Sequence, residues 1–238
     1  MKYFLGVIIL INTLSFAKLN NIELNKPIKV ALFDTGLDIN DSRFSSHVCG
    51  AYDFTNSGTT EDQMGHGTHI AGLIMKYAGN KNYCFVVMKV FNSDTQTFEQ
   101  ANKAIGEAYK TLQEIKPAIV NFSGGGNSPV DNEEYTISIL QNTRFIVAAG
   151  NHNEDIRTLS GIFYPASFNY SNITSVGALG MDGKKMGLSN FGRGVFFQPG
   201  ELIDSTVPYS INPEGHAVMS GTSMATAIET GKFIYEHY

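Results

Sequence analysis

Short apolar runs, each bounded by turn-forming residues, recur along this chain and constrain its fold more than any other feature. Several runs are continuous rather than alternating, such as Val-Ala-Leu-Phe at 30–33 and Phe-Ile-Val-Ala-Ala at 145–149. Continuous apolar strands are typical of a parallel sheet that is covered on both faces. We therefore predict seven strands, at residues 28–33, 48–54, 84–91, 118–122, 144–149, 173–178 and 194–198.

Segments with helical periodicity separate these runs, and we predict helices at 65–77, 98–115, 131–141 and 222–236. The second helix ends before Pro117, which cannot continue it. The third carries Asp131, Glu133 and Glu134 in its first turn, where the helix dipole favours acidic side chains. The alternation of strands and helices predicts an α/β fold, with a doubly wound, mostly parallel seven-stranded sheet and helices on both faces.

The composition and the N-terminus narrow the class of protein. Charged residues make up 16% of the chain, the formal net charge is −5, and no basic run is present, so we expect no nucleic-acid partner. Residues 1–17 are predicted to be a signal peptide, with Lys2 before an apolar stretch and small residues at Ser15 and Ala17. The alternative is a membrane anchor, but the stretch is shorter than the ~20 residues that a spanning helix needs.

These observations predict an exported protein, periplasmic or secreted, that has no stable membrane anchor after signal cleavage. Residues 18–238 are long enough for one α/β domain with a sizeable core and too few for two. We expect this segment to be a single minimal catalytic domain. The oligomeric state is left open.

Three short motifs carry chemically informative residues, in the order Asp, His, Ser. They are Asp-Thr-Gly at 34–36, His-Gly-Thr-His at 66–69 and Gly-Thr-Ser-Met-Ala at 221–225. A histidine can take the proton of a weakly nucleophilic serine, and a carboxylate can hold the imidazole and stabilise its cation. Asp34, His66 and Ser223 are therefore the candidate catalytic residues. Ser223 taken alone would more commonly be a helix N-cap.

This order of the three residues resembles that of the subtilisin-like serine proteases. Ala-Ala-Gly-Asn at 148–151 resembles the oxyanion-hole segment of that family, and Asn-Phe-Ser-Gly-Gly-Gly at 121–126 resembles its substrate-binding strand. The resemblance implies that Asn151 donates to the developing oxyanion and that peptide substrate binds along Ser123, Gly124 and Gly125. From the residues alone, Asn151 could also be a turn residue and the glycine segment a flexible loop.

The resemblance also implies a specificity residue and a disulfide. The Tyr164-Pro165 pair resembles a Tyr-Pro pair of the family, and the residue before that pair sits at the bottom of the primary specificity pocket. Here it is Phe163, whose ring would admit only short side chains unless it turns into the core. In the family's sheet order, the strands that begin near Cys49 and Cys84 are parallel neighbours, so we expect a disulfide, with two buried free thiols as the alternative.

The departures from the family bear on metals and maturation. We predict no cofactor and no metal site: Arg43 occupies the position of a usual calcium carboxylate, and the loop at 78–83 is too short for the family's insertion. His69 is expected to be a structural histidine rather than a ligand. We expect no pro-region between residues 17 and 28, and Glu229 falls where the family is apolar.

The resemblance implies an exported serine endopeptidase that hydrolyses polypeptide substrates through an acyl-enzyme intermediate. The alternative is an inactive or weakly active subtilase-like peptide-binding module, which the expected lack of a pro-region and the altered helix after Ser223 favour. An esterase with the same triad is a third possibility. Retention of Asp34, His66, Ser223 and Asn151 together favours the endopeptidase.

Overall fold

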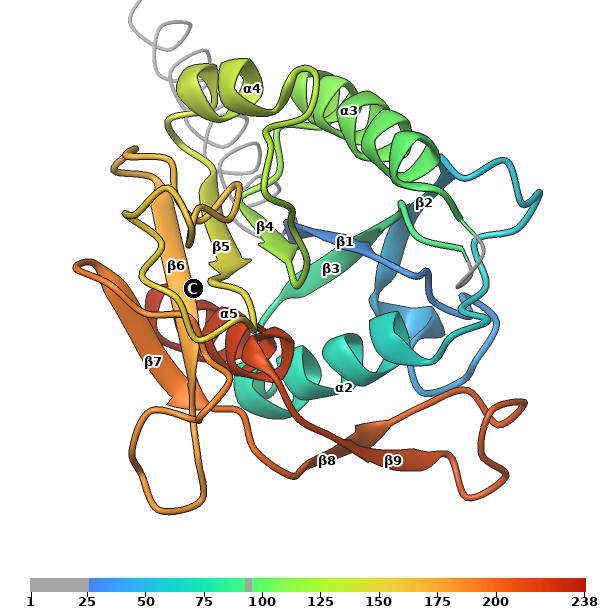
Figure 1. Ribbon diagram of the computed structural model, residues 1–238. Coiled ribbons are helices and arrows are strands. Elements are labelled where there is room, and N and C mark those ends of the chain that lie inside the picture. The colour runs from blue at the N-terminus through green and yellow to red at the C-terminus, as the bar shows by residue number, and fades with distance from the viewer. Residues whose placement is uncertain (1–25, 93–95) are drawn as a thin grey trace, which may run out of the picture.

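The computed structural model describes residues 26–92 and 96–238, so the predicted signal peptide lies outside the described residues. The centre of the molecule is a seven-stranded sheet in the order β2-β3-β1-β4-β5-β6-β7, in which every pair of neighbours is parallel (Figure 1). The seven predicted strands are all present, as β1 (Ile28–Asp34), β2 (Val48–Asp53), β3 (Tyr83–Lys89), β4 (Ile119–Phe122), β5 (Arg144–Ala148), β6 (Ile173–Leu179) and β7 (Val195–Pro199).

Helices cover both faces of this sheet, as predicted. In Figure 1, α2 and α5 lie on one face, and α3 and α4 lie on the other. Their bounds, with those of a short 3₁₀ helix before β2, are η1 (Ser45–His47), α2 (His66–Ala78), α3 (Phe98–Ile115), α4 (Glu133–Ile139) and α5 (Thr222–His237). The third predicted helix is shorter than expected, because Asn132 adopts a left-handed conformation and α4 begins only at Glu133.

Two apolar cores, one on each face of the sheet, explain why the strand sequences are continuous. In β1, Val30 and Leu32 pack with α2 and α5, whereas Ala31 and Phe33 pack with α3. All four are 0% exposed. Successive side chains of a strand point to opposite faces, so both faces need apolar residues. Burial of each large aliphatic or aromatic side chain contributes about 1.5–3 kcal/mol to folding.

An antiparallel hairpin that the sequence analysis did not predict packs on α2. It consists of β8 (Ile203–Thr206) and β9 (His216–Met219). Ser205 Oγ donates to the backbone carbonyl of His69 over 2.8 Å, and His69 Nε2 lies 3.1 Å from the carbonyl oxygens of Ile203 and Ala217. His69 is therefore a buried structural residue that connects the helix to the hairpin, as expected.

A disulfide joins β2, at the edge of the sheet, to its neighbour β3. Cys49 on β2 and Cys84 on β3 are bonded, with their Cα atoms 5.6 Å apart, a distance within the normal range for a bridge. The predicted pairing is thus confirmed, because β2 and β3 are parallel neighbours.

Within residues 26–92 and 96–238, no helix combines the length and apolar character needed to cross a membrane.

Candidate active site

The turn after β1 places a buried carboxylate at the carboxyl edge of the sheet. Asp34, the last residue of β1, is 1% exposed and accepts a hydrogen bond from the backbone N–H of Thr35 over 2.8 Å. The next residue, Gly36, has φ of 109°, and a Cβ atom there would collide with the carbonyl oxygen of Thr60. Only glycine fits both constraints, so the Asp-Thr-Gly sequence is what turns the chain and leaves Asp34 at this edge.

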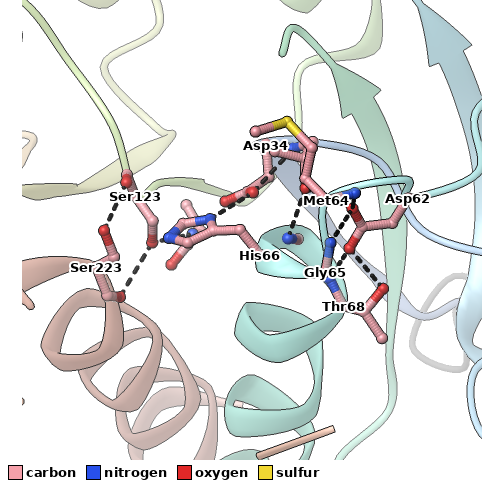
Figure 2. A network of polar contacts seen from close by, with 11 residues as sticks. Asp34, Asp62, Met64, Gly65, His66, Thr68, Ser123 and Ser223 are labelled. Carbon is pink, nitrogen blue, oxygen red and sulfur yellow. Dashed lines mark hydrogen bonds and ion pairs between the residues drawn. The ribbon is translucent and has the colours of Figure 1, made fainter. Parts of the chain in front are cut away.

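His66 faces Asp34 from the first position of α2. Its Nδ1 lies 2.7 Å from Asp34 Oδ1, as the dashed line between them in Figure 2 marks. Burial disfavours the imidazolium and lowers the pKa of His66. The charge and hydrogen bond of Asp34, together with the charge of Asp62, outweigh that effect and raise the pKa above its usual 6.5. The pair therefore holds one tautomer, with the proton on Nδ1 and a lone pair on Nε2.

A second buried carboxylate, Asp62, fixes the start of α2. It is 3% exposed. Its Oδ2 accepts hydrogen bonds from the backbone N–H and the hydroxyl of Thr68, over 2.8 and 2.7 Å, and its Oδ1 accepts from the N–H of Gly65 over 2.8 Å (Figure 2). These donors include backbone groups that a helix N-terminus leaves without partners, and a negative charge there is favourable.

The same carboxylate connects α2 to the turn that holds Asp34. Thr35 Oγ1 donates to Asp62 Oδ1 over 2.7 Å and accepts a hydrogen bond from the N–H of Gly67 over 2.8 Å. The positions of Asp34 and His66 are thus tied to each other through Thr35 and Asp62. The sequence analysis missed Asp62, although a carboxylate within one turn before a helix is a recognisable capping signal.

Ser223 reaches the same edge from the second position of α5. Its Oγ donates to the backbone carbonyl of Ser123 over 2.9 Å, and Ser123 Oγ donates in return to the backbone carbonyl of Ser223 over 3.1 Å. Figure 2 shows the ring of His66 between Asp34 and these two serines. The structure therefore brings Asp34, His66 and Ser223 together from three elements that are far apart in the sequence.

Asn151 lies beside the N-terminus of α5. Its Oδ1 accepts hydrogen bonds from the backbone N–H and the hydroxyl of Thr222, over 3.0 and 3.1 Å. This pairing orients the amide so that Nδ2 is the donor available to an incoming group. The residue is exposed and follows Gly150, whose φ is 100°. The geometry is suited to holding negative charge next to Ser223, because the N-terminus of α5 contributes in the same sense.

Phe163 lies between the two segments that flank this site. A Cβ atom on Gly125 would come within 2.6 Å of the Phe163 ring, and one on Gly150 within 3.0 Å. The ring also contacts the core beneath α3. The adjacent backbone is fixed because Gly126 and Tyr164 exchange N–H to carbonyl bonds of 3.0 and 2.7 Å. Phe163 therefore fills the space between the glycine segment and the turn at Asn151.

A cavity of about 780 Å³ opens beside His66, and its lining runs past Gly126 to Glu133 on α4.

Within the described ranges, no cluster of three or more His, Cys, Asp or Glu side chains is placed to hold a metal ion. Arg43, at the position where a calcium carboxylate was considered, is bound to Asp41 and donates to the carbonyl oxygens of Val207 and Gly215, over 2.8 and 2.9 Å. Its guanidinium thus serves a structural purpose.

Comparison with known sequences agrees with the family that the motifs resemble. The sequence profile of the subtilase family matches residues 25–233. An extracellular serine proteinase of Thermus sp. (strain Rt41A) is 32% identical over 83% of this chain, and a subtilisin-like protease of Arthroderma gypseum is 32% identical over 87% of it. The aligned regions cover 47% and 43% of those two relatives, so the chain matches less than half of either protein.

Comparison with solved structures supports the same fold. A cold-adapted subtilisin-like serine proteinase is 26% identical, with a TM-score of 0.67 over 87% of this chain and 74% of its own. A lanthipeptide protease is 22% identical, with a TM-score of 0.70 over 90% of this chain and 74% of its own, and shares the fold. The profile match covers nearly all of the described residues, and the chain therefore belongs to the subtilase family, the subtilisin-like serine proteases.

Proposed function

We propose that this chain is an exported serine endopeptidase in which Asp34, His66 and Ser223 form the catalytic triad. The observation that carries the proposal is the 2.7 Å contact between Asp34 Oδ1 and His66 Nδ1, at the edge of the sheet where Ser223 also lies. The names of the relatives support a polypeptide substrate, and the extracellular location of the Thermus proteinase supports export. The predicted signal peptide at 1–17 supports export independently.

In the proposed reaction, Ser223 Oγ attacks the carbonyl carbon of a peptide bond while His66 Nε2 takes its proton. Asp34 keeps the other proton on Nδ1 and stabilises the imidazolium. Asn151 Nδ2 and the N-terminus of α5 hold the developing oxyanion, and one such donor typically contributes about 10²–10³-fold to turnover. The C–N bond then breaks, His66 protonates the leaving amine, and water hydrolyses the acyl-enzyme by the same steps.

The hydroxyl of Ser223 has to move before it can react. It donates to the carbonyl of Ser123 in this structure, so rotation about χ1 must turn it toward His66. The Ser123 carbonyl is then free to accept an N–H from substrate. In a strand, the backbone N–H and C=O groups of successive residues point to opposite edges. The backbone of Gly126 pairs with Tyr164, so the N–H and C=O groups of Gly125 point to the other edge of the segment. A substrate strand is proposed to bind along Ser123, Gly124 and Gly125.

The triad assignment leads to a defined pH dependence. His66 acts as a base only when neutral, and its pKa is raised above 6.5, so activity should be lost at acidic pH and rise through a midpoint above 6.5. The measurement is kcat/KM between about pH 5 and pH 9, with circular dichroism at each pH to check folding. A profile that stays flat across this range, in folded protein, would contradict the assignment.

Phe163 is predicted to restrict the primary specificity pocket. Since its ring occupies the space between Gly125 and Gly150, the wild-type protein should cleave best after small residues such as Ala or Ser. Replacement by glycine should shift the preference toward Phe and Leu by about tenfold or more, because the ring no longer excludes them.

Profiling of a peptide library with wild-type protein and Phe163→Gly measures this shift. Phe196→Ala is the matched control, because it removes a half-exposed aromatic ring on β7, outside the candidate site. A wild-type preference for Phe or Leu that persists unchanged in Phe163→Gly would show that the pocket is open despite the ring.

A further inference from the structure

The cavity beside His66 contains one buried acidic group. Glu133, the first residue of α4, lines this cavity and is 2% exposed. Around it the lining includes apolar side chains from α3, β4 and the loop before α4, namely Ile105, Phe122 and Val130. Among the described lining residues, Glu133 is the only acidic one, and none is lysine or arginine. The cavity thus presents an acidic group with no lysine or arginine among the described lining residues to neutralise it.

The groups that contact Glu133 are neutral or acidic. Its Oε2 accepts the backbone N–H of Val130 over 3.2 Å, and the buried hydroxyl of Tyr109 on α3, which has no hydrogen-bond partner among the described residues, is its other polar neighbour. Burial and, to a smaller extent, the charge of the neighbouring Glu134 raise the pKa of Glu133 to about 7, against the opposite effects of Val130 and Tyr109. A cation from outside the chain would relieve this cost, because it favours the charged carboxylate.

We propose that this cavity is a specificity site for a basic side chain of the substrate, lysine or arginine, and that Glu133 is the residue that recognises it. The inference rests on the proposed function, since a peptide bound along Ser123–Gly125 would pass the cavity at Gly125 and Gly126, which both line it. The apolar walls would contact the methylene groups of the basic side chain, and Glu133 would pair with its charged end.

The volume of the cavity does not distinguish a basic side chain from a large apolar one, so the test compares two residues that share a four-carbon side chain and differ in its terminal ammonium group. Peptides would carry lysine or norleucine at each of the positions before the cleaved bond, with glutamate and arginine as further members. The quantity measured is the ratio of kcat/KM for the lysine peptide to that for the norleucine peptide. His66 titrates equally in both reactions, so its contribution cancels from this ratio.

At one substrate position, the lysine-to-norleucine ratio of kcat/KM is expected to be about tenfold or more at about pH 8. A change of this size corresponds to the free energy of a hydrogen bond to a charged group. The ratio should fall at about pH 6, because Glu133 is then mostly protonated. Glu133→Gln keeps an acceptor for Val130 and removes the charge, so the ratio should approach one and lose its pH dependence. Glu134→Gln is the control, since it removes a neighbouring exposed carboxylate and should retain the wild-type ratio at about pH 8, where Glu133 stays charged.

A lysine-to-norleucine ratio near one in wild type at every position, or a high ratio that persists in Glu133→Gln, would overturn the inference. If Glu133→Gln does not fold, as judged by its thermal unfolding, the pH dependence of the wild-type ratio decides the question. If folded wild-type protein cleaves no peptide, the proposed function fails, but the inference is still testable. Fluorescence anisotropy would then compare binding of labelled lysine and norleucine peptides, and equal affinities at about pH 8 would overturn it.

Discussion

Replacement of Ser223 by alanine is expected to lower kcat/KM for a peptide substrate by about 10⁶-fold while the fold is retained. The loss is large because no other group at the site can form the acyl-enzyme, and only binding and oxyanion stabilisation would remain. The fold should be retained because the side chain is small and partly exposed, and its hydroxyl bonds only the carbonyl of Ser123 among the described residues.

Peptide hydrolysis and far-UV circular dichroism of Ser223→Ala together measure this effect. Ser210→Ala, which removes an exposed hydroxyl outside the site, is the matched control and should be indistinguishable from wild type. Wild-type turnover in folded Ser223→Ala would mean that another residue is the nucleophile.

Replacement of Asp34 by asparagine is the second large effect, an expected loss of about 10⁴-fold in kcat/KM. The N–H of Thr35 and Nδ1 of His66 both contact Oδ1 of Asp34. An amide oxygen in that place would keep both contacts but lack the charge that stabilises the imidazolium, whereas an NH₂ group there would lose the bond from Thr35 and donate to His66 Nδ1. That donation moves the imidazole proton to Nε2, where it can no longer accept the proton of Ser223. The variant also removes the main influence that raises the pKa of His66, so this pKa should fall.

Steady-state kinetics of Asp34→Asn measure the loss, and NMR titration of the histidine ring measures the change in its pKa. Asp38→Asn, in the loop that follows the same turn, is the control and should keep both properties near those of wild type. Loss of less than tenfold in Asp34→Asn would indicate that the carboxylate does not orient His66.

The sheet, and the meeting of Asp34, His66 and Ser223 at one of its edges, could be predicted because both depend on local patterns. A continuous apolar run identifies a strand that is buried on both faces, and a polar residue directly after it must lie at the carboxyl edge. Asp34 and Asn151 follow such strands, and Ser223 lies at the start of a helix that packs against the same sheet. Their convergence therefore followed from the order of elements along the chain.

The hairpin of β8 and β9 could not be predicted in the same way. Its strands consist mainly of exposed and partly buried residues, and Ser205 is their one buried residue. Hydrogen bonds to α2 hold the hairpin in place: Ser205 donates to the backbone carbonyl of His69, and the His69 ring contacts the carbonyl of Ile203. In each bond the two residues are more than a hundred positions apart in the sequence. No local pattern records such contacts.

Buried carboxylates were also beyond local patterns. Glu133 and Glu134 are adjacent acidic residues in the first turn of a predicted helix, yet the structure buries Glu133 and leaves Glu134 exposed. The position of Asp62 before α2 indicates a helix cap, but its burial depends on the five donors that the fold assembles around it. Burial of this kind is set by tertiary packing.

Glu229 shows how a departure from the family pattern is accommodated. It lies on α5 and is only partly buried, and its Oε2 accepts a hydrogen bond from Gln198 on β7 over 2.7 Å. Gln198 in turn accepts from Lys232 over 2.8 Å. A polar chain of contacts thus replaces apolar packing between the helix and the edge of the sheet.

The central claim, that Ser223 is an activated nucleophile in an endopeptidase, is tested most directly by covalent labelling. Folded protein would be incubated with a fluorophosphonate probe, the modified residue identified by mass spectrometry, and the same sample assayed on casein or a peptide library. The account expects labelling at Ser223 together with peptide cleavage. Absence of labelling in folded protein would contradict it in favour of a peptide-binding module, and labelling without peptide cleavage would contradict it in favour of an esterase.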